Sequence, residues 1–151
     1  MGSAHNVAAY VVAQAGPLSA MKLQKLCYYS QAWSLVWDQQ PLFDDRIEAW
    51  ANGPVVRSLY AQHRGQYTIH SWPGGDANAL TSDERATIDA VIASYNKLTA
   101  QQLSDLTHSE APWLNARGST PLSERSEAEI TTESMASFYG SLASRVDTED
   151  V

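Results

Sequence analysis

The chain has 151 residues, with 10 Lys and Arg against 17 Asp and Glu, and its net charge is −7. Its 44% of hydrophobic and 18% of charged residues exclude a disordered or fibrous protein, and we expect residues 1–151 to form a single domain. Because phosphate backbones are bound through a surplus of Lys and Arg, the acidic composition argues against direct nucleic-acid binding. No stretch reaches the roughly 20 apolar residues of a membrane span, and no secretory leader opens the chain, so we expect a cytoplasmic protein without a membrane partner.

The single cysteine, Cys27, excludes an intramolecular disulfide and cysteine-rich zinc sites. Four histidines lie in four separate segments, without the paired spacing that a metal site requires. No glycine-rich phosphate loop is present in the sequence either. We therefore expect neither a bound metal nor a cofactor.

Two helices are predicted in the first part of the chain. Apolar residues at helical spacing predict one over 6–14, which Gly16-Pro17 ends. Ser19 can cap the second, over 21–37. Because residues 21–37 are apolar on nearly every side, we expect this to be the central buried helix of the domain.

A small β element follows. Alternating residues predict a short strand over 46–50, which Asn52-Gly53-Pro54 ends. Pro54 then lies in the first turn of a helix that continues to Gly65. The β-branched and aromatic residues of 66–72 predict a second strand, which pairs with the first as a hairpin. The expected fold class is therefore mainly α (α+β), a compact helical domain around the central helix with a small β-hairpin.

Three more helices are expected in the second half. Capping-box spacing begins one over 81–95, and Thr99 caps the next, which Pro112 breaks. Residues 117–134 are rich in Ser, Thr and Glu and predict a polar, mobile connection before a final helix over 135–142. From Glu124 onward, seven carboxylates and two arginines give −5 of the net −7, so this part either solvates the surface or steers a basic partner.

Ser104, Asp105 and His108 share one turn of a predicted helix, where a Ser and a His four residues apart can touch as nucleophile and base. Nothing nearby supplies an oxyanion site. The sequence therefore favours a structural role, in which His108 bonds backbone groups left unpaired at Pro112 and Trp113 covers the break. We interpret the chain as a non-enzyme and keep an enzyme based on Asp105 and His108 as an alternative.

Two other features have a structural and a functional interpretation. Lys22 and Lys25 share a helix face; such pairs are usually solvated, but a partner or a buried carboxylate can also hold them. Gly53-Pro54-Val55 predicts a strand-to-helix corner, whose free amides could receive a carboxylate. Five tryptophans and seven tyrosines supply the core or a protein interface.

Three segments carry a recognisable pattern: MKLQKLCYYSQAW at 21–33, PLFDDRIEAWANGPVV at 41–56 and LSDLTHSEAPW at 103–113. In this order and spacing they resemble the SocA-like antitoxin family, also called the Panacea antitoxin domain. The resemblance extends over about 6–113, and residues 130–139 are similar to the closing helix of the family. It implies a mostly helical domain with a small β element, encoded beside a toxin and often in phage or prophage DNA.

No catalytic residue comes with the resemblance. Arg57 stands where the family pattern leads us to expect a proline, and residues 1–20 hold one helix instead of the helix-turn-helix of longer relatives, which argues against autoregulation by DNA binding. The positions that match the family motif, and that we take as partner-binding or family-signature residues, are Lys22, Gln24, Lys25, Tyr29, Trp50, Gly53, Pro54, Tyr60, Thr107, His108, Pro112 and Trp113.

The resemblance implies that the chain neutralises a cognate protein toxin, encoded by the adjacent gene, by forming a direct complex with it. In this hypothesis, aromatic side chains near Gly53 and Pro112-Trp113 anchor the toxin, while carboxylates speed encounter and cover its basic substrate-binding residues. The alternative, implied by the family's best-known namesake, is a proteolytic adaptor that presents the toxin to a AAA+ protease. An adaptor needs a mobile segment, for which residues 119–134 or the tail after Arg145 are the candidates.

Overall fold

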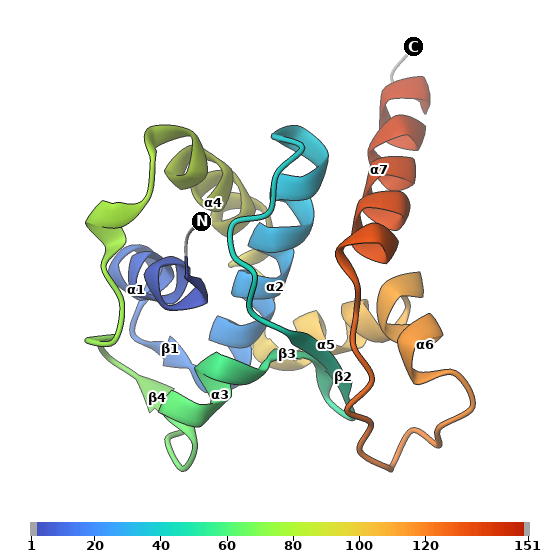
Figure 1. Ribbon diagram of the computed structural model, residues 1–151, viewed down its shortest axis with the longest axis horizontal. Coiled ribbons are helices and arrows are strands. Elements are labelled where there is room, and N and C mark those ends of the chain that lie inside the picture. The colour runs from blue at the N-terminus through green and yellow to red at the C-terminus, as the bar shows by residue number, and fades with distance from the viewer. Residues whose placement is uncertain (1–2, 150–151) are drawn as a thin grey trace.

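The structure is a computed structural model and describes residues 3–149. Within this range the chain is mainly α-helical with a small β-hairpin, as the sequence predicts, and it has a second small antiparallel sheet. Figure 1 shows α2 running through the middle of the molecule, with α1 and α4 on one side and α7 on the other. The elements are α1 (Ala4–Ala15), β1 (Leu18–Ser19), α2 (Ala20–Trp37), β2 (Ile47–Trp50), β3 (Gly53–Val56), α3 (Arg57–His63), β4 (Thr68–Ile69), η1 (Ala77–Ala79), α4 (Ser82–Tyr95), α5 (Ala100–His108), α6 (Ala111–Arg117) and α7 (Thr132–Glu149).

The central buried helix is confirmed. The Ser19 hydroxyl accepts a hydrogen bond from the backbone N–H of Lys22 at 3.1 Å and thereby caps α2. Every residue from 23 to 34 is buried, because α1, α4, α5, α7 and the β2–β3 hairpin pack around the helix. Each buried leucine on α2 contributes about 2 kcal/mol through the apolar surface that it removes from water. The helix is therefore the scaffold against which the rest of the chain is placed.

The caps of α4 and α5 begin these helices where the sequence predicts. Thr81 and Glu84 form a capping box, in which each side chain bonds the other residue's backbone N–H, and Thr99 and Gln102 form a second one. The predicted break at Pro112 is wrong: α5 ends earlier, at His108, and Pro112 lies in the first turn of a further short helix, α6, which begins at Ala111. Proline in its first turn costs α6 no hydrogen bond, because the N–H groups there have no partner within the helix.

The predicted role of Pro54 is wrong. Residues Gly53–Val56 form strand β3, which pairs antiparallel with β2, and α3 begins only at Arg57. Pro54 faces Ala49, whose backbone N–H points away from β3 and donates to the carbonyl of Ala128. A proline opposite such a residue removes no hydrogen bond from the ladder, so the strand accepts it.

The predicted partner of the second strand is also wrong. Within 66–72 only β4 is a strand, and it pairs with β1, through Leu18 with Ile69, and not with β2. Both edges of β2 are already occupied, one by β3 and the other by the segment before α7. A strand with no free edge cannot take another partner, so β4 pairs at the other end of the domain.

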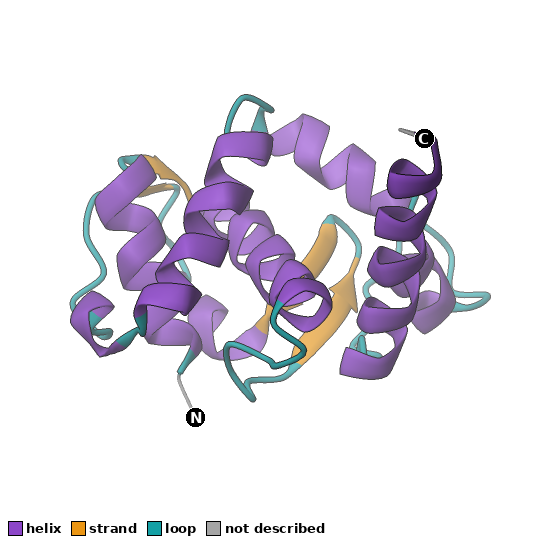
Figure 2. Cartoon of the chain, turned by 90° about the horizontal axis from the view of Figure 1, so that it is seen from above, coloured by secondary structure: helices purple, strands orange, loops and turns teal. Residues whose placement is uncertain are grey.

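The polar connection between α6 and α7 is hydrogen-bonded to the hairpin. The backbone N–H of Ile130 donates to the carbonyl of Ile47 at 2.9 Å, so this segment extends the sheet along the edge of β2 that lies opposite β3. Arg117 donates hydrogen bonds to the carbonyl of Ala49 in β2 and to the carbonyls of Pro121 and Glu124 in the connection. Figure 2 shows the hairpin strands, in orange, between the central helices and the C-terminal helix. The tail after Arg145 continues α7 to Glu149, and residues 150–151 lie outside the described residues.

A cationic cleft at the hairpin as candidate functional site

Two hollows meet on the surface beside the β2–β3 hairpin and share the side chains of Trp50, Tyr60 and Arg125. The first has a volume of about 340 Å³ and lies between the start of α2, the hairpin and α3. The second, of about 350 Å³, continues along α3. We call the two together the hairpin cleft. It is lined by Met21, Gln24, Lys25, Trp50, Ala51, Asn52, Val55, Arg57, Tyr60, Ala61, His63, Arg64 and Arg125.

The wall shared by the two hollows is aromatic. The rings of Trp50 and Tyr60 meet edge to face, with their centroids 4.8 Å apart. The guanidinium of Arg125 lies over the Trp50 ring at 3.9 Å from its centroid, so it covers one face of the indole. Because each of these side chains packs on the next, the wall has a defined shape before any partner arrives.

The charge of the cleft is opposite to that of the whole chain. Its cationic side chains are Lys25, Arg57, Arg64 and Arg125, and no Asp or Glu of residues 3–149 lines either hollow. Four of the ten Lys and Arg are therefore gathered at one place in a protein of net charge −7. Such a cluster attracts anionic groups, while the rest of the surface repels them.

Lys25 is buried, with 1% of its surface exposed, and forms no ion pair with a carboxylate of residues 3–149. Its Nζ donates to the carbonyl oxygen of Pro54 at 3.2 Å, and burial lowers the pKa of Lys25 to about 8. Gly53 makes room for this side chain, because a Cβ at position 53 would lie 2.5 Å from Cε of Lys25. Gly53 also has a φ of +120°, a conformation that favours glycine.

Gln24 joins the start of α2 to the hairpin and to α3. Its Oε1 accepts from the backbone N–H of Val56 at 2.8 Å, and its Nε2 donates to the carbonyl of Val56 at 3.2 Å. These two bonds fix the orientation of the amide, so Nε2 also donates to Nε2 of His63 at 2.9 Å. His63 must accept here and is therefore neutral. Burial lowers the pKa of His63 in agreement with this arrangement.

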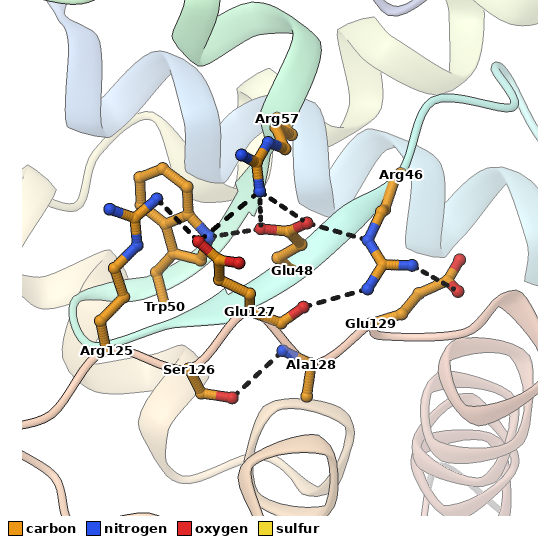
Figure 3. A network of polar contacts seen from close by, with 9 residues as sticks. All are labelled: Arg46, Glu48, Trp50, Arg57, Arg125, Ser126, Glu127, Ala128 and Glu129. Atoms are coloured by element: carbon orange, nitrogen blue, oxygen red, sulfur yellow. Dashed lines mark hydrogen bonds and ion pairs between the residues drawn. The ribbon is translucent and has the colours of Figure 1, made fainter.

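A second polar network holds the hairpin from the opposite side and contains the buried carboxylate of Glu48 (Figure 3). Glu48 accepts from Trp50 Nε1 at 2.8 Å, from Arg46 Nε at 2.8 Å and from the Arg57 guanidinium at 3.2 Å. Burial alone would raise the pKa of Glu48. The hydrogen bonds from Trp50, Arg46 and Arg57 outweigh it and hold the pKa below its usual value.

The connection before α7 completes this network, as Figure 3 shows. Glu127 lies 3.4 Å from Arg125 and 3.7 Å from Arg57, and Glu129 lies 3.1 Å from Arg46. These pairs are exposed and contribute little to stability individually, but they hold the cationic side chains in place. The connection thus supplies one side of the hairpin cleft.

The predicted signature residues divide into those that line the cleft and those that support it. Gln24, Lys25, Trp50 and Tyr60 line it. Gly53 and Pro54 lie against Lys25, and Oγ1 of Thr107 lies 3.0 Å from where a Cβ of residue 53 would be. Lys22 lies elsewhere and donates through Nζ to the carbonyl of Asn96 at 2.6 Å.

Of the remaining signature residues, Tyr29, Pro112 and Trp113 are buried and His108 is partly buried. Trp113 is 1% exposed, and its Nε1 donates to the carbonyl of Trp50 at 2.8 Å. This hydrogen bond fixes the end of β2 from the interior of the protein. The His108 ring stacks on Trp113 with centroids 4.0 Å apart, and its Nε2 has no hydrogen-bond partner among residues 3–149, whereas the sequence predicts bonds to backbone groups near Pro112. Burial, followed by the charge of Lys25, lowers the pKa of His108. A buried Trp113 offers no surface to anchor a partner.

Tyr29 belongs to a buried polar cluster around Glu110. Its hydroxyl donates to Oε1 of Glu110 at 2.7 Å, as does the hydroxyl of Tyr139 at 2.8 Å. Burial raises the pKa of Glu110, and the two tyrosine hydroxyls oppose this effect. The cluster lies between α2, α6 and α7 and is part of the core.

The Ser104–His108 pair that an enzyme would need is not formed. Ser104 donates through its hydroxyl to the carbonyl of Asn52, and Asp105 accepts from Gln101 at 2.9 Å. Within residues 3–149, no group of three or more His, Cys, Asp and Glu side chains could hold a metal ion. The helices of the same range include none with the length and apolar character that crossing a membrane requires.

Sequence reasoning missed Glu48 and the arginines of the cleft. Arg46 and Glu48 are two residues apart on one strand and so share a face, which is a signal that could have indicated the ion pair. Arg64 and Arg125 carry no such signal, because only the fold brings them together.

The family model described as Antitoxin SocA-like, Panacea domain matches residues 23–114. This range extends from the first turns of α2 to α6 and includes the hairpin and most side chains of the cleft. No curated protein and no solved structure matches the chain.

Proposed function

The chain belongs to the family of SocA-like antitoxins with a Panacea domain, and from this premise we propose that it neutralises a cognate protein toxin by forming a direct complex with it. The toxin is encoded by the adjacent gene, in phage or prophage DNA, and both proteins act in the cytoplasm. In this role the chain makes and breaks no covalent bond.

The observation that carries the proposal is the family match over the segment that builds the hairpin cleft. A rigid aromatic wall with cationic side chains around it, open to solvent, is the kind of surface that binds a protein with few entropic losses. The carboxylates outside the cleft act over longer distances: they repel anionic groups of a partner and attract its cationic groups, and so orient its approach.

Co-expression tests the proposal directly. The adjacent gene product, expressed alone, should stop growth, and expression of this chain with it should restore growth. The two purified proteins should elute together in size-exclusion chromatography. A neighbouring product that is harmless, or that forms no complex with this chain, would contradict the proposal.

The half-life of the toxin separates inhibition by binding from the adaptor alternative. If the chain acts by binding, growth rescue and toxin half-life are the same in cells that lack the AAA+ protease. An adaptor would lose rescue in these cells, because the toxin would no longer be degraded. The hydrogen bonds that hold the connection against β2 favour inhibition by binding, since an adaptor needs a mobile segment for the protease.

A further inference from the structure

The hairpin cleft combines an apolar hollow with a cationic one. In the first hollow, Met21, Val55, Trp50 and Tyr60 present apolar surface, and the volume of about 340 Å³ suits one large side chain. The second hollow is lined by three arginines, all of them exposed at the surface. A ligand that fills both must carry an apolar group next to an anionic one.

The arginines differ in how far their charge is already matched. Arg57 and Arg125 share the carboxylate of Glu127, and Arg57 also contacts Glu48. Arg64 has no ion pair with any carboxylate of residues 3–149, and it follows the last residue of α3 directly. On the other side of the aromatic wall, Lys25 adds a buried ammonium that pairs with no carboxylate of the described part of the chain. The cleft therefore keeps positive charge that the protein itself does not neutralise.

We propose that the hairpin cleft receives an acidic segment of the toxin, with an apolar side chain in the hollow between α2 and α3 and an Asp or Glu carboxylate on Arg64. This inference rests on the proposed function and names the chemistry of the partner surface. Outside the cleft, the remaining 6 Lys and Arg stand against 17 Asp and Glu, so the rest of the chain on average repels an acidic segment. The charge pattern thus selects one orientation of the complex.

A carboxylate fits the cleft better than a nucleic acid does. Single-stranded nucleic acids need an open aromatic face on which bases stack, together with a cationic groove that follows the backbone. In the cleft, the Arg125 guanidinium lies over the Trp50 ring and Tyr60 meets that ring edge to face. The cations are also confined to two short hollows instead of a continuous groove.

A phage-displayed library of random peptides, selected on the full chain, tests the proposal without knowledge of the toxin. We expect the selected peptides to carry Asp or Glu within a few positions of a large apolar residue. Their affinity should fall about tenfold or more for Arg64→Glu and remain unchanged for Arg145→Glu. Arg145 is exposed on α7, so the two variants have the same net charge and differ only in the place of the substitution.

Three results would overturn the inference. The first is a selection that yields neutral or basic peptides, or no peptides at all. The second is equal affinity of the two variants for the selected peptides. The third comes from a separate binding assay with a uridine oligonucleotide, if the unchanged chain binds it and Arg64→Glu does not. Thermal unfolding of Arg64→Glu should match that of the unchanged chain, which shows that the fold is intact.

The toxin provides a second, independent arm. Arg64→Glu should weaken the complex with the toxin about tenfold or more. Toxin variants selected because Arg64→Glu neutralises them should carry Lys or Arg in place of an Asp or Glu of the unchanged toxin. If Arg64→Glu binds the toxin as tightly as the unchanged chain does, the inference fails and the proposed function stands. If the unchanged chain binds no toxin, the proposed function fails, whereas the peptide selection still decides what the cleft binds.

Discussion

Glu48 and Lys25 are buried charged side chains on two sides of the same hairpin, and their surroundings differ. Glu48 receives hydrogen bonds from two arginines and a tryptophan, and its pKa is below the usual value. Lys25 has one carbonyl oxygen as its hydrogen-bond partner, and its pKa falls to about 8. The protein thus compensates the charge of the hairpin's anion and leaves the charge of its cation largely uncompensated.

The difference indicates two roles. A compensated buried charge fixes the geometry of the elements that contribute its partners, here β2, α3 and the connection before α7. An uncompensated buried ammonium lowers the free energy of unfolding and holds few elements of the fold together. Proteins typically retain such destabilising groups at binding sites. Lys25 lines the hairpin cleft, in agreement with the acidic partner segment proposed above.

Crowding Lys25 should produce the largest effect. Gly53→Ala should lower the free energy of unfolding by about 3 kcal/mol, because it strains a backbone with positive φ and drives a methyl group against Lys25. The matched control is Gly65→Ala, where φ is also positive, at +87°, but nothing lies within 4 Å. That control should cost about 1 kcal/mol in urea unfolding. Equal costs at the two glycines would show that the contact with Lys25 contributes nothing.

Removing the charge of Glu48 should have the next largest effect. Glu48→Gln keeps the shape but leaves Arg46 and Arg57 without their carboxylate, and we expect a loss of about 2 kcal/mol, because both arginines are half exposed and water recovers part of the interaction. Glu129→Gln, at the exposed partner of Arg46, should change stability by less than about 0.5 kcal/mol. Urea unfolding of the two variants at neutral pH measures the difference.

The pH dependence of the Glu48 variant gives an independent check. The pKa of Glu48 is lowered in the folded state, so its stabilisation is present above the ordinary value of 4.5 and is lost as the pH falls through the folded pKa. Acid should therefore destabilise Glu48→Gln less than it destabilises the unchanged chain. An equal decrease in both would show that the network does not depend on the carboxylate charge.

The opposite sign is expected for Lys25. The shift of its pKa from 10.5 to about 8 corresponds to about 3 kcal/mol of lost stability, at about 1.4 kcal/mol per unit. Lys25→Met removes this cost but leaves the Pro54 carbonyl without a donor, so the net gain at neutral pH should be about 1 to 2 kcal/mol. The same variant should weaken binding of the acidic peptides. Lys22→Met, whose ammonium is partly exposed, is the matched control and should leave stability nearly unchanged.

Alkaline pH sharpens this result. Because the folded pKa of Lys25 lies below the unfolded one, the unfolded chain holds more protons between the two values, and the stability of the unchanged chain rises with pH from about 8 to 10.5. Lys25→Met should lack this rise. Burial also raises the pKa of Tyr29, which lowers stability near pH 10 in both proteins, so the difference between them is the quantity to measure. A parallel pH dependence would contradict an uncompensated Lys25.

Local sequence signals predict the helices well, because their causes are local. Ser19 caps α2 through a bond to the N–H of a residue three positions later, and Thr81 begins α4 in the same way. The burial of α2 follows from its composition, since a helix that is apolar on nearly every side must be covered on nearly every side. These elements required no knowledge of their neighbours.

The hairpin and the cleft depend on contacts that are distant in sequence. Gly53-Pro54 has the local pattern of a helix start, but pairing with β2 and the two bonds from Gln24 to Val56 place it in a strand. The cleft joins Arg64 to Arg125 across a segment that the sequence presents as a polar connection. No periodicity in the sequence links such residues. Sequence reasoning therefore named several residues of the hairpin cleft but did not predict that cationic side chains gather there.

The smallest expected effect concerns His63, which faces the same cleft as Lys25. Gln24 donates a hydrogen bond to Nε2 of His63. Protonation of His63 would make this nitrogen a donor facing the Gln24 donor, so the bond and burial both keep the imidazole neutral in the folded state. Burial lowers the pKa of His63 from 6.5 in the folded state, so the unfolded chain binds the proton more readily. Stability should therefore fall as the pH drops below about 6.5. His63→Phe should remove part of this decrease in urea unfolding between about pH 5 and 7. His108, whose pKa burial also lowers, contributes to the same decrease, and His70→Phe, at an exposed position, is the matched control. If His63→Phe retains the full decrease, the group that takes up the proton lies elsewhere, and the bond from Gln24 does not hold the imidazole neutral.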